Sequence, residues 1–349
     1  MRRSKLLFLF SCVILICALA AGCASTGSAA KASGGDALSL WNDEAPAKKA
    51  LTEYVAAVTK EGSADFIPKE HRVAVFDLDG TLFCETHPTY FDIQMFIRRV
   101  TEDPTYTPTK AMIDYAENFK KTGVLPPINT ENEQMFTETY KGMTLGEFAG
   151  YVESFMETDQ PGYTNLKRKD AFYKPMVELI HYLIQNDFTV YVSSGTNRML
   201  LRTLTKNALG LPPNQIIGSD SIIIAKGQGD TDDLGYIYTH NEELVLAGKY
   251  LDKNLQMTKT SKIVREIGTH PVISFGNTMT DASMVNYVMS NPTYRSLGFM
   301  VICDDFDREY GNPELMEKMT KGCNQYGWIP VSMKNDWKTI YGENVKKTE

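Results

Sequence analysis

Short apolar runs alternate with longer amphipathic segments along most of the chain. The runs are rich in β-branched and aromatic residues and end at polar or glycine residues, which is typical of buried strands. They cover residues 73–76, 188–192, 216–224, 272–275, 299–303 and 329–332. In the amphipathic segments, apolar residues recur at helical spacing. These segments cover residues 38–62, 90–100, 110–121, 145–157, 174–187, 259–267 and 313–322. The alternation predicts an α/β protein with a Rossmann-like, doubly wound parallel sheet.

One long stretch interrupts this alternation. Residues 83–173 contain several helical segments and little strand signal, so we expect a helical domain inserted into a core domain of residues 38–82 and 174–349. Thr144 and Glu147 are spaced as a capping box at the start of the last helix of the insertion.

A second irregularity follows the strand at 216–224. Residues 227–235 form a loop rich in glycine and aspartate, and the chain is expected to return as a strand at 236–238, which makes a hairpin. The aspartates of this loop do not have the spacing of an EF-hand, so the sequence favours a solvated loop over a calcium site.

The first strand delivers two carboxylates at its C-terminal end. Asp77 and Asp79 are two residues apart, so both side chains project from the same side of the strand end. Ligands bind at this edge of open α/β sheets, and the pair suits a nucleophile beside a general acid or base. Gly80 allows a sharp turn next to a ligand, and Thr81 adds a hydroxyl group. The stretch therefore predicts a reactive site.

The N-terminus has the pattern of a signal peptide. Three basic residues within the first five precede an apolar run at 6–21, which is short for a membrane span. Residues 20–23, Ala-Ala-Gly-Cys, resemble the bacterial lipobox, in which the cysteine, here Cys23, is lipidated and becomes the mature N-terminus. An ordinary secretory signal and an uncleaved anchor are the alternatives.

Small and polar residues after the cysteine favour the lipoprotein. We therefore expect a lipoprotein signal peptide at 1–23 and a flexible tether at 24–37. This predicts a protein outside the cytoplasm, lipid-anchored to a bacterial cell membrane on its periplasmic or cell-surface side.

The charge of the chain limits its partners. The full sequence has a formal net charge of −7, and loss of residues 1–23 removes three basic and no acidic residues, which leaves 33 basic and 43 acidic residues and a net charge of −10. Such a protein has no electrostatic attraction to nucleic acid or anionic lipid. Contact with the membrane is therefore expected through the N-terminal lipid only.

Three cysteines remain after the predicted lipidation site. They are Cys84, Cys303 and Cys323. A Cys303–Cys323 disulfide and buried free thiols are both compatible with an oxidising compartment. No CxxC pair or cluster of histidine and cysteine suggests zinc.

Several segments together resemble the signatures of the haloacid dehalogenase superfamily, most of whose members are phosphatases. Residues 77–81, Asp-Leu-Asp-Gly-Thr, resemble the first signature. Ser194, followed by Gly195 at the end of the strand at 188–192, resembles the second. The long helical insertion between them is similar to the cap of the C1-capped, phosphoserine phosphatase-like branch.

The later signatures are matched nearer the C-terminus. The resemblance calls for a lysine before the strand at 272–275; Lys259 fits best, and Lys262 competes with it. Residues 276–281, Gly-Asn-Thr-Met-Thr-Asp, resemble the fourth signature, in which two acidic residues help to bind magnesium. Asp281 is the second acid, but Asn277 replaces the first, and its amide oxygen can bind a cation without supplying charge.

The resemblance implies hydrolysis of a phosphomonoester through an aspartyl-phosphate. In this mechanism Asp77 attacks phosphorus, and Asp79 protonates the leaving oxygen and later activates water. Ser194 and Lys259 hold the phosphoryl oxygens. The implied ligands of a Mg²⁺ cofactor are Asp77, Asp79, Asn277 and Asp281.

The expected substrate is a small phosphorylated metabolite. In the branch that the sequence resembles, a glutamate at about the position of Glu85 faces the substrate, and Thr81 and Gly195 lie beside it. A phosphoserine-like or phosphocholine-like amine is expected if Glu85 faces the site; a surface pair or cap is the simpler role for this residue. A membrane-tethered protein that binds a phosphorylated ligand without turnover is the alternative function, with Asn277 in its favour. A structural envelope lipoprotein would explain only the signal peptide.

Overall fold

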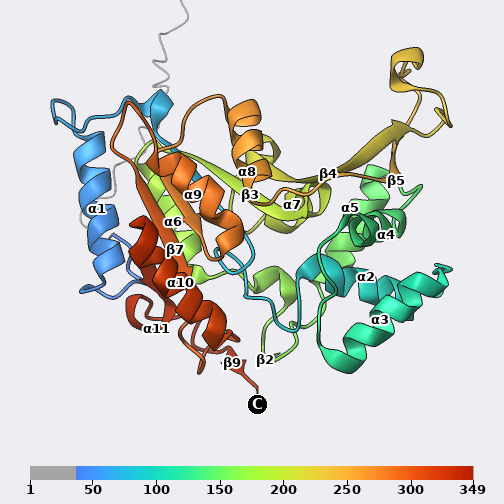
Figure 1. The fold of residues 1–349 in the computed structure, drawn as a ribbon, viewed down its shortest axis with the longest axis horizontal. Coiled ribbons are helices and arrows are strands. Elements are labelled where there is room, and N and C mark those ends of the chain that lie inside the picture. The colour runs from blue at the N-terminus through green and yellow to red at the C-terminus, as the bar shows by residue number, and fades with distance from the viewer. Residues whose placement is uncertain (1–36, 349) are drawn as a thin grey trace, which may run out of the picture. The chain divides into compact units, whose positions relative to one another are not determined.

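A seven-stranded sheet lies at the centre of residues 37–348, the part of the chain that this computed structural model describes (Figure 1). The strand order is β5-β4-β3-β1-β6-β7-β8. In that order the strands span Leu244–Asp252, Ile216–Ala225, Thr189–Asn197, Val73–Phe76, Ile273–Gly276, Leu297–Ile302 and Ile329–Ser332. Neighbouring strands are parallel except for β5, which is antiparallel to β4. The predicted α/β class and parallel sheet are confirmed.

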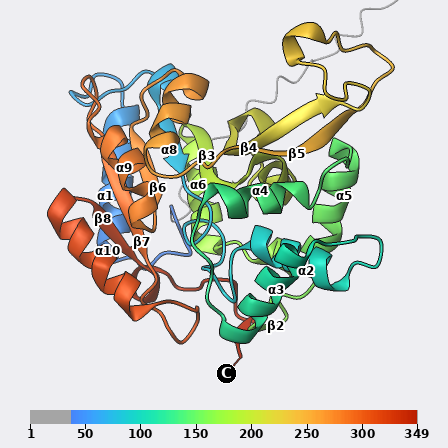
Figure 2. The same cartoon turned by 45° about the vertical axis from the view of Figure 1, so that its right-hand side comes forward.

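Helices occupy both faces of this sheet (Figure 2). The helices of the described residues are α1 Pro46–Thr59, α2 Phe91–Glu102, α3 Lys110–Thr122, α4 Thr130–Glu138, α5 Leu145–Met156, α6 Lys174–Gln185, α7 Arg198–Thr205, α8 Met257–Lys262, α9 Ala282–Met289, α10 Pro313–Tyr326 and α11 Met333–Asp336, of which α2–α5 lie in the insertion. A two-stranded ribbon pairs β2 Tyr163–Thr164 with β9 Lys346–Lys347. The predicted helix at 259–267 divides into α8 and the π-helical segment Ile263–Ile267.

Strand β1 is apolar on both sides, which explains why helices cover both faces. Ala74 and Phe76 belong to one apolar cluster, which includes residues of α1 and α6. Val73 and Val75 belong to a second cluster, which includes residues of α9 and α10. Because successive strand residues point to opposite faces, this continuous apolar run fits a strand buried between two helical layers. The burial fixes β1 in the middle of the sheet, where its C-terminal end can hold a reactive site.

The helices α2–α5 form the predicted insertion between β1 and β3. Helices α2, α3 and α4 share an apolar cluster in which the ring of Phe96 packs edge-on against Tyr115 and Phe136, with centroids 5.5 and 4.9 Å apart, whereas the buried residues of α5 belong to the main core. These aromatic residues therefore serve as helix core, as expected from their number and spacing. The capping box between Thr144 and Glu147 is present at the start of α5.

Helix α4 was not predicted. The division into two domains at residues 83–173 stays a prediction.

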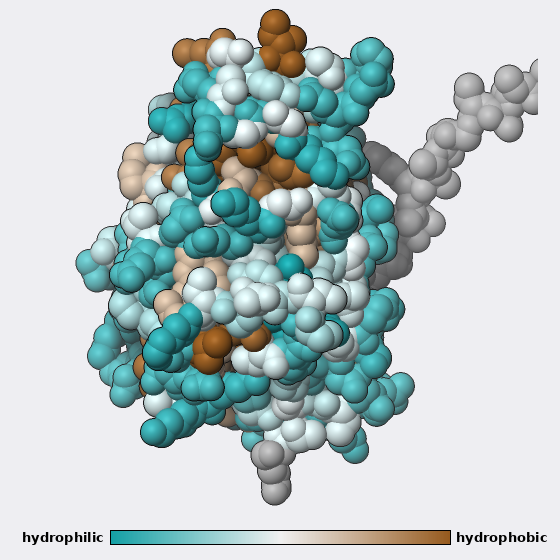
Figure 3. All heavy atoms as spheres, turned by 90° about the vertical axis from the view of Figure 1, so that its right-hand side faces the viewer, coloured by the Kyte–Doolittle hydropathy of each residue, from teal (hydrophilic) through white to brown (hydrophobic). Residues whose placement is uncertain are grey.

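The predicted return strand of the hairpin is wrong. The chain returns as β5, where Leu246 pairs with Ile223, whereas Ile237 lies in the connecting loop and is 85% exposed. Burial decides the position of the strand, because Val245, Leu246 and Ala247 are all buried. Figure 3 views the side of the molecule that carries this hairpin and the insertion, and shows a mostly hydrophilic surface with apolar groups between polar ones and others that project at its upper end.

The N-terminal predictions fall outside the described part of the chain. The structure does not describe residues 1–36. This range contains the predicted signal peptide at 1–23 with Cys23, and all of the predicted tether at 24–37 except its last residue. Between residues 37 and 348, no helix is both long enough and apolar enough to cross a bilayer.

Candidate active site

The strand ends of β1, β3 and β6 bring the predicted site residues to one edge of the sheet. Asp77 follows β1 directly, and its backbone N–H donates to the carbonyl of Phe275 in β6 at 2.9 Å. The chain then turns at Gly80, whose φ of 78° is in the left-handed region. A Cβ atom on Gly80 would lie 1.9 Å from Asn277 Nδ2 and 2.7 Å from Glu85 Oε2. Glycine is therefore required here both by its backbone conformation and by the side chains packed against it.

Asp77 is buried and held from two sides. Its Oδ1 accepts a hydrogen bond from Lys259 Nζ at 2.5 Å, and its Oδ2 accepts one from the Thr81 hydroxyl at 3.4 Å. Burial raises the pKa of Asp77 to about 7, and the negative charge of Asp281 adds to this rise, whereas Lys259 opposes it. The lysine favours the anionic form of Asp77, which is the form that a nucleophile needs.

The structure places the two candidate lysines in different surroundings. Lys259 is fully buried, and its Nζ contacts Asp77 Oδ1 and Asp281 Oδ1 at 2.5 and 2.6 Å. Burial alone lowers the pKa of Lys259, but the charges of Asp281 and Asp77 outweigh this effect and raise it. Lys262 instead contacts Asp220 and Asp252, each at 2.6 Å. Of the two, only Lys259 lies against the proposed nucleophile.

Asp79 is bound by a residue that the sequence analysis did not assign to the site. Its Oδ2 accepts a hydrogen bond from the Thr196 hydroxyl at 3.0 Å. Burial raises the pKa of Asp79 to about 7, and the charge of Asp92 contributes, whereas the bond from Thr196 lowers it. A carboxyl group with this pKa can donate and accept a proton near neutral pH, as a general acid and base must.

Ser194 lies fully buried in the neighbouring strand β3. Its hydroxyl oxygen accepts from the backbone N–H of Thr196 at 3.1 Å, and its carbonyl accepts from Asn254 Nδ2 at 3.0 Å. Gly195 allows a close approach of the chain after β5, since a Cβ atom there would lie 2.7 Å from Leu255. The β3 end is thus fixed by Asn254, which is remote in sequence and which no local pattern identifies.

The loop after β6 presents Asn277 and Asp281. Asp281 Oδ2 accepts from the backbone N–H groups of Asn277 and Thr278, each at 3.1 Å, which closes the loop into a capping box. Asn277 Nδ2 donates to Glu85 Oε2 at 3.3 Å. Burial raises the pKa of Glu85 to about 7, and the charge of Glu309 contributes. The structure thus brings Glu85 to the loop that was predicted to bind metal; its role as a substrate ligand stays a prediction.

The donor chemistry of these residues fits a hard divalent cation. Asp77, Asp79, Glu85 and Asp281 are carboxyl residues of one site, and Lys259 is the cation in contact with Asp77 and Asp281. Three of the four carboxyl groups have raised pKa values because burial and neighbouring negative charge disfavour ionisation. Among residues 37–348, no three His, Cys, Asp or Glu side chains are already arranged around a single point as a metal site. A cation that joins them must therefore draw on the amide oxygen of Asn277 or on substrate oxygens as well.

A cavity of about 60 Å³ lies between the insertion and the core. Its lining includes Asp92, Glu133, Tyr140, Phe148, Tyr250 and Lys253. Asp92 relates this cavity to Asp79, because the charge of Asp92 contributes to the raised pKa of Asp79. Lys253 is paired with Glu133 at 3.0 Å. The cavity combines aromatic surface with charged groups, one of which, Asp92, acts on the pKa of Asp79.

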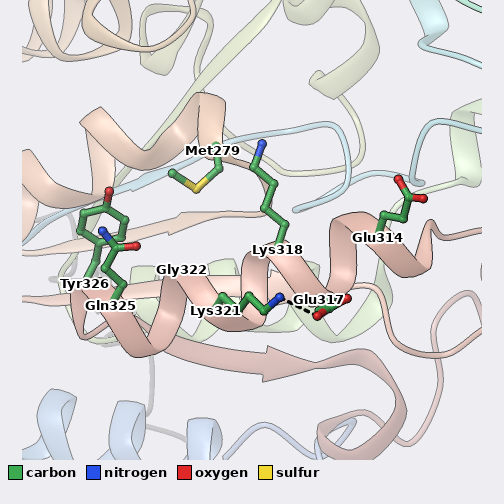
Figure 4. A pocket seen from close by; sticks show the side chains of 8 residues that line it. All are labelled: Met279, Glu314, Glu317, Lys318, Lys321, Gly322, Gln325 and Tyr326. Carbon is green, nitrogen blue, oxygen red and sulfur yellow. Dashed lines mark hydrogen bonds and ion pairs between the residues drawn. The ribbon is translucent and has the colours of Figure 1, made fainter.

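A larger groove runs along α10, and none of the predicted site residues lines it (Figure 4). Its cavity volume is about 340 Å³, and Lys321 in its wall is paired with Glu317 at 2.6 Å. Both of these side chains are largely exposed. The groove is therefore a solvated helix surface.

The three cysteines in the described residues are buried free thiols, so no Cys303–Cys323 disulfide is present.

Comparison with known protein families agrees with the geometry. A family model described as haloacid dehalogenase-like hydrolase matches residues 74–284, which includes β1, the insertion and the loop after β6. The chain belongs to this family of hydrolases. The family predicted from the sequence is confirmed. No curated protein sequence matches the chain significantly.

Solved structures resemble the chain in fold at low sequence identity. A functionally unknown protein from Anaerococcus prevotii is 13% identical, with a TM-score of 0.50, over 81% of this chain and 91% of its own. A protein of unknown function from Bordetella pertussis is 14% identical, with a TM-score of 0.48, over 75% of this chain and 98% of its own. Cytosolic 5′-nucleotidase IIIB, solved with bound cytidine, is 12% identical, with a TM-score of 0.46, over 84% of this chain and 86% of its own.

Proposed function

We propose that the protein is a Mg²⁺-dependent phosphomonoester hydrolase that acts through an aspartyl-phosphate on small organic phosphates outside the cytoplasm. The observation that carries this proposal is the pair of carboxyl groups after β1. Lys259 contacts Asp77 at 2.5 Å, whereas Asp79 receives a hydroxyl hydrogen bond from Thr196 at 3.0 Å. Both carboxyl groups therefore titrate near neutral pH, and the contact with Lys259 favours the anionic form of Asp77.

These two environments match two chemical roles. In the first step a carboxylate oxygen of Asp77 forms a bond to phosphorus, and the bond from phosphorus to the ester oxygen breaks. Asp79 gives its proton to that oxygen, so the alcohol leaves neutral. In the second step Asp79 takes a proton from water, whose oxygen attacks phosphorus and releases phosphate from Asp77. Lys259 offsets the negative charge that Asp77 shares with the phosphoryl group.

The carboxyl-rich site explains the expected need for a divalent cation. When bound, Mg²⁺ would neutralise charge between the carboxylates and the phosphoryl group. The residues that would hold it are Asp77, Asp79, Asn277 and Asp281. Ser194 would contribute a hydroxyl group to the phosphoryl oxygens, and helix α7 begins three residues after Gly195.

The cavity beside Asp92 is the proposed place for the body of the substrate. Its aromatic residues provide apolar contact, and the carboxylates of Asp92 and Glu133 favour hydroxyl or amine groups. Because the cavity is small, a short metabolite fits this proposal better than a polymer. An amine-bearing substrate follows if Glu85 also contacts it.

An assay of the full chain on p-nitrophenyl phosphate, with and without Mg²⁺, tests the activity. We expect Mg²⁺-dependent release of phosphate that is lost in Asp77→Asn. Asp230→Asn, the same change at an exposed position of the hairpin loop, is the matched control and should keep full activity. If folded wild-type protein releases no phosphate from a broad panel of monoesters, the hydrolase proposal is wrong.

Asn277 motivates a second candidate, a tethered protein that binds a phosphorylated ligand without turnover. It lacks the charge of the acid that the fourth signature carries at this position. Calorimetric titration with a substrate panel separates the two functions, because a binder would retain intact monoester in the presence of Mg²⁺. The hydrolase is favoured since a binder has no need for a nucleophile beside a proton donor.

The membrane anchor is a separate part of the proposal. Its basis is the sequence around Cys23 and the small, polar residues that follow. Cells that express the full chain should incorporate labelled palmitate into it, and Cys23→Ser should abolish the label. Label that persists in this variant, or wild-type protein in the cytosolic fraction, would contradict the anchor.

A further inference from the structure

The insertion carries a second cavity, of about 390 Å³, which shares no lining residue with the cavity next to the catalytic aspartates. It lies among α2, α3, the end of α5 and the short segment that contains Arg168. Its lining includes the side chains of Ile97, Arg98, Phe119, Lys120, Phe155 and Arg168. Cationic and apolar side chains thus lie together in the lining, which also includes the acidic residues Glu102 and Asp159.

Arg168 is a buried cation whose bonds go to neutral groups. Only 7% of the residue is exposed. Its Nε donates to the hydroxyl of Thr158 at 3.0 Å, and its Nη1 donates to Gln94 and Gln160 at 2.5 and 3.4 Å. Burial lowers the pKa of Arg168 to about 10, and the positive charge of Arg98 acts in the same direction. A buried guanidinium normally has a carboxylate or another anion as its partner.

Arg98 adds a second positive charge to the same place. Its Nη1 is buried and has no hydrogen-bond partner in the described chain. The guanidinium carbons of Arg98 and Arg168 lie 5.6 and 4.3 Å from the centre of the Phe155 ring, so two cations share one aromatic side chain. Throughout residues 37–348, no carboxylate oxygen forms an ion pair with either arginine. Both guanidinium groups thus lie against the Phe155 ring, and neither has a carboxylate of residues 37–348 within ion-pair distance.

The remaining polar residues of the cavity do not supply that counter-ion. Lys120 donates to the Thr101 hydroxyl at 2.9 Å and adds positive charge at the rim. Asp159 is already paired with Lys167 at 2.6 Å. Glu102 also lines the cavity and forms no ion pair with either arginine within residues 37–348, although its charge acts to raise the pKa of Arg168. Three cationic and two acidic side chains line the cavity, so its formal charge is positive, and Phe119 and Phe155 supply apolar surface.

We propose that this cavity is a binding site for an organic anion that joins a carboxylate or phosphate group to an apolar body. The planar guanidinium groups would donate paired hydrogen bonds to the oxygens of the anion. The apolar body would lie against Phe119, Phe155 and Ile97. Binding at this site requires neither Asp77 nor a metal, so the proposal can be tested independently of the proposed hydrolase activity.

Calorimetric titration of the full chain tests the site with two probes, benzoate and phenylphosphonate. We expect at least one of them to bind, and the probe that binds identifies the anionic group. Arg98→Gln should weaken this binding about tenfold or more, since a charge-assisted hydrogen bond is lost. Added salt should weaken it as well. Arg265→Gln, the same change at an exposed position, is the control and should leave binding unchanged.

The design separates this cavity from the catalytic site, where phenylphosphonate is also expected to bind. Binding at the catalytic site would survive Arg98→Gln, whereas binding at the proposed site would not. Arg98→Gln should remain folded, because the side chain of Arg98 makes no hydrogen bond within residues 37–348, and hydrolysis of p-nitrophenyl phosphate should be unchanged in this variant. Failure of both probes to bind at millimolar concentration, or equal binding by wild type and Arg98→Gln, would overturn the proposal.

Discussion

Asn277 and Glu85 form a buried pair across the turn at Gly80, with Asn277 Nδ2 donating to Glu85 Oε2 at 3.3 Å. Both residues are less than a tenth exposed. An amide can donate to a carboxylate, but a second carboxylate at this position would repel it. The asparagine that departs from the family signature is therefore matched to the glutamate opposite, and the pair retains one negative charge.

Asn277→Asp should destabilise the metal-free protein. The variant places two carboxyl groups against each other in a buried site, which we expect to cost about 1–3 kcal/mol. Mg²⁺ should recover stability, because it can neutralise the added charge. Thermal unfolding with and without Mg²⁺ measures both effects. Addition of Glu85→Gln to the same chain should remove the metal-free loss, and an unchanged unfolding temperature in Asn277→Asp would contradict the argument.

Lys259→Met should destabilise the protein and abolish phosphate release. Without the lysine, Asp77 and Asp281 remain buried and lose their common counter-charge, which is expected to cost about 3–5 kcal/mol. Urea unfolding of the variant, together with the p-nitrophenyl phosphate assay, measures the two effects. The same change at the exposed Lys318 is the control. A stable but inactive variant would show that the lysine matters for catalysis alone.

Much of this site could be predicted because its residues follow apolar strands in the chain. The strand at 73–76 and the final strand at 329–332 have the predicted bounds. Local sequence cannot identify partners that meet only in the folded chain, such as Thr196 with Asp79 or Asn254 with Ser194.

The errors in the predicted fold also have physical causes. The return strand of the hairpin was placed too early because Ile237 and its neighbours resemble a strand, although only β5 becomes buried. Helix α4 was missed because its apolar residues are few, and only Glu133 of its length is buried. In both cases packing against distant segments outweighs the local pattern.

Glu309→Gln should change how stability depends on pH. Burial raises the pKa of Glu309 above its ordinary value of 4.5, against the lowering effect of hydrogen bonds from Tyr163 and Tyr341. The folded state therefore holds this proton at pH values where the unfolded chain has released it. The contribution to stability is present below pH 4.5 and is lost as pH rises towards and through the folded pKa.

The measurement is the free energy of unfolding, obtained by urea titration at several pH values from 4.5 upward. The wild type should lose stability over this range more steeply than Glu309→Gln, whose amide does not titrate. Glu314→Gln, the same change at an exposed helix position, is the control and should follow the wild type. Parallel curves for the wild type and Glu309→Gln would contradict the raised pKa.

Gly80→Ala should lower the free energy of unfolding by more than the backbone strain of an alanine at this φ alone can explain. At a φ of 78°, any side chain costs roughly 1–2 kcal/mol, but here the new methyl group would also overlap Asn277 Nδ2. Gly229→Ala separates the two effects, because Gly229 has a φ of 57° and no atom within 4 Å of its added Cβ. We expect Gly229→Ala to lose only the backbone contribution and to keep full activity.

Both stability and phosphate release should be measured in Gly80→Ala and in Gly229→Ala. Gly80→Ala must displace Asn277 or Glu85, so its unfolding free energy should fall further than that of Gly229→Ala, and phosphate release should fall as well. A double variant with Asn277→Ala removes the overlapping group; it should regain stability relative to Gly80→Ala without regaining activity, because the site then lacks its amide. Equal losses of stability in the two alanine variants would show that the turn tolerates a methyl group, and that the contact between Gly80 and Asn277 does not fix the site.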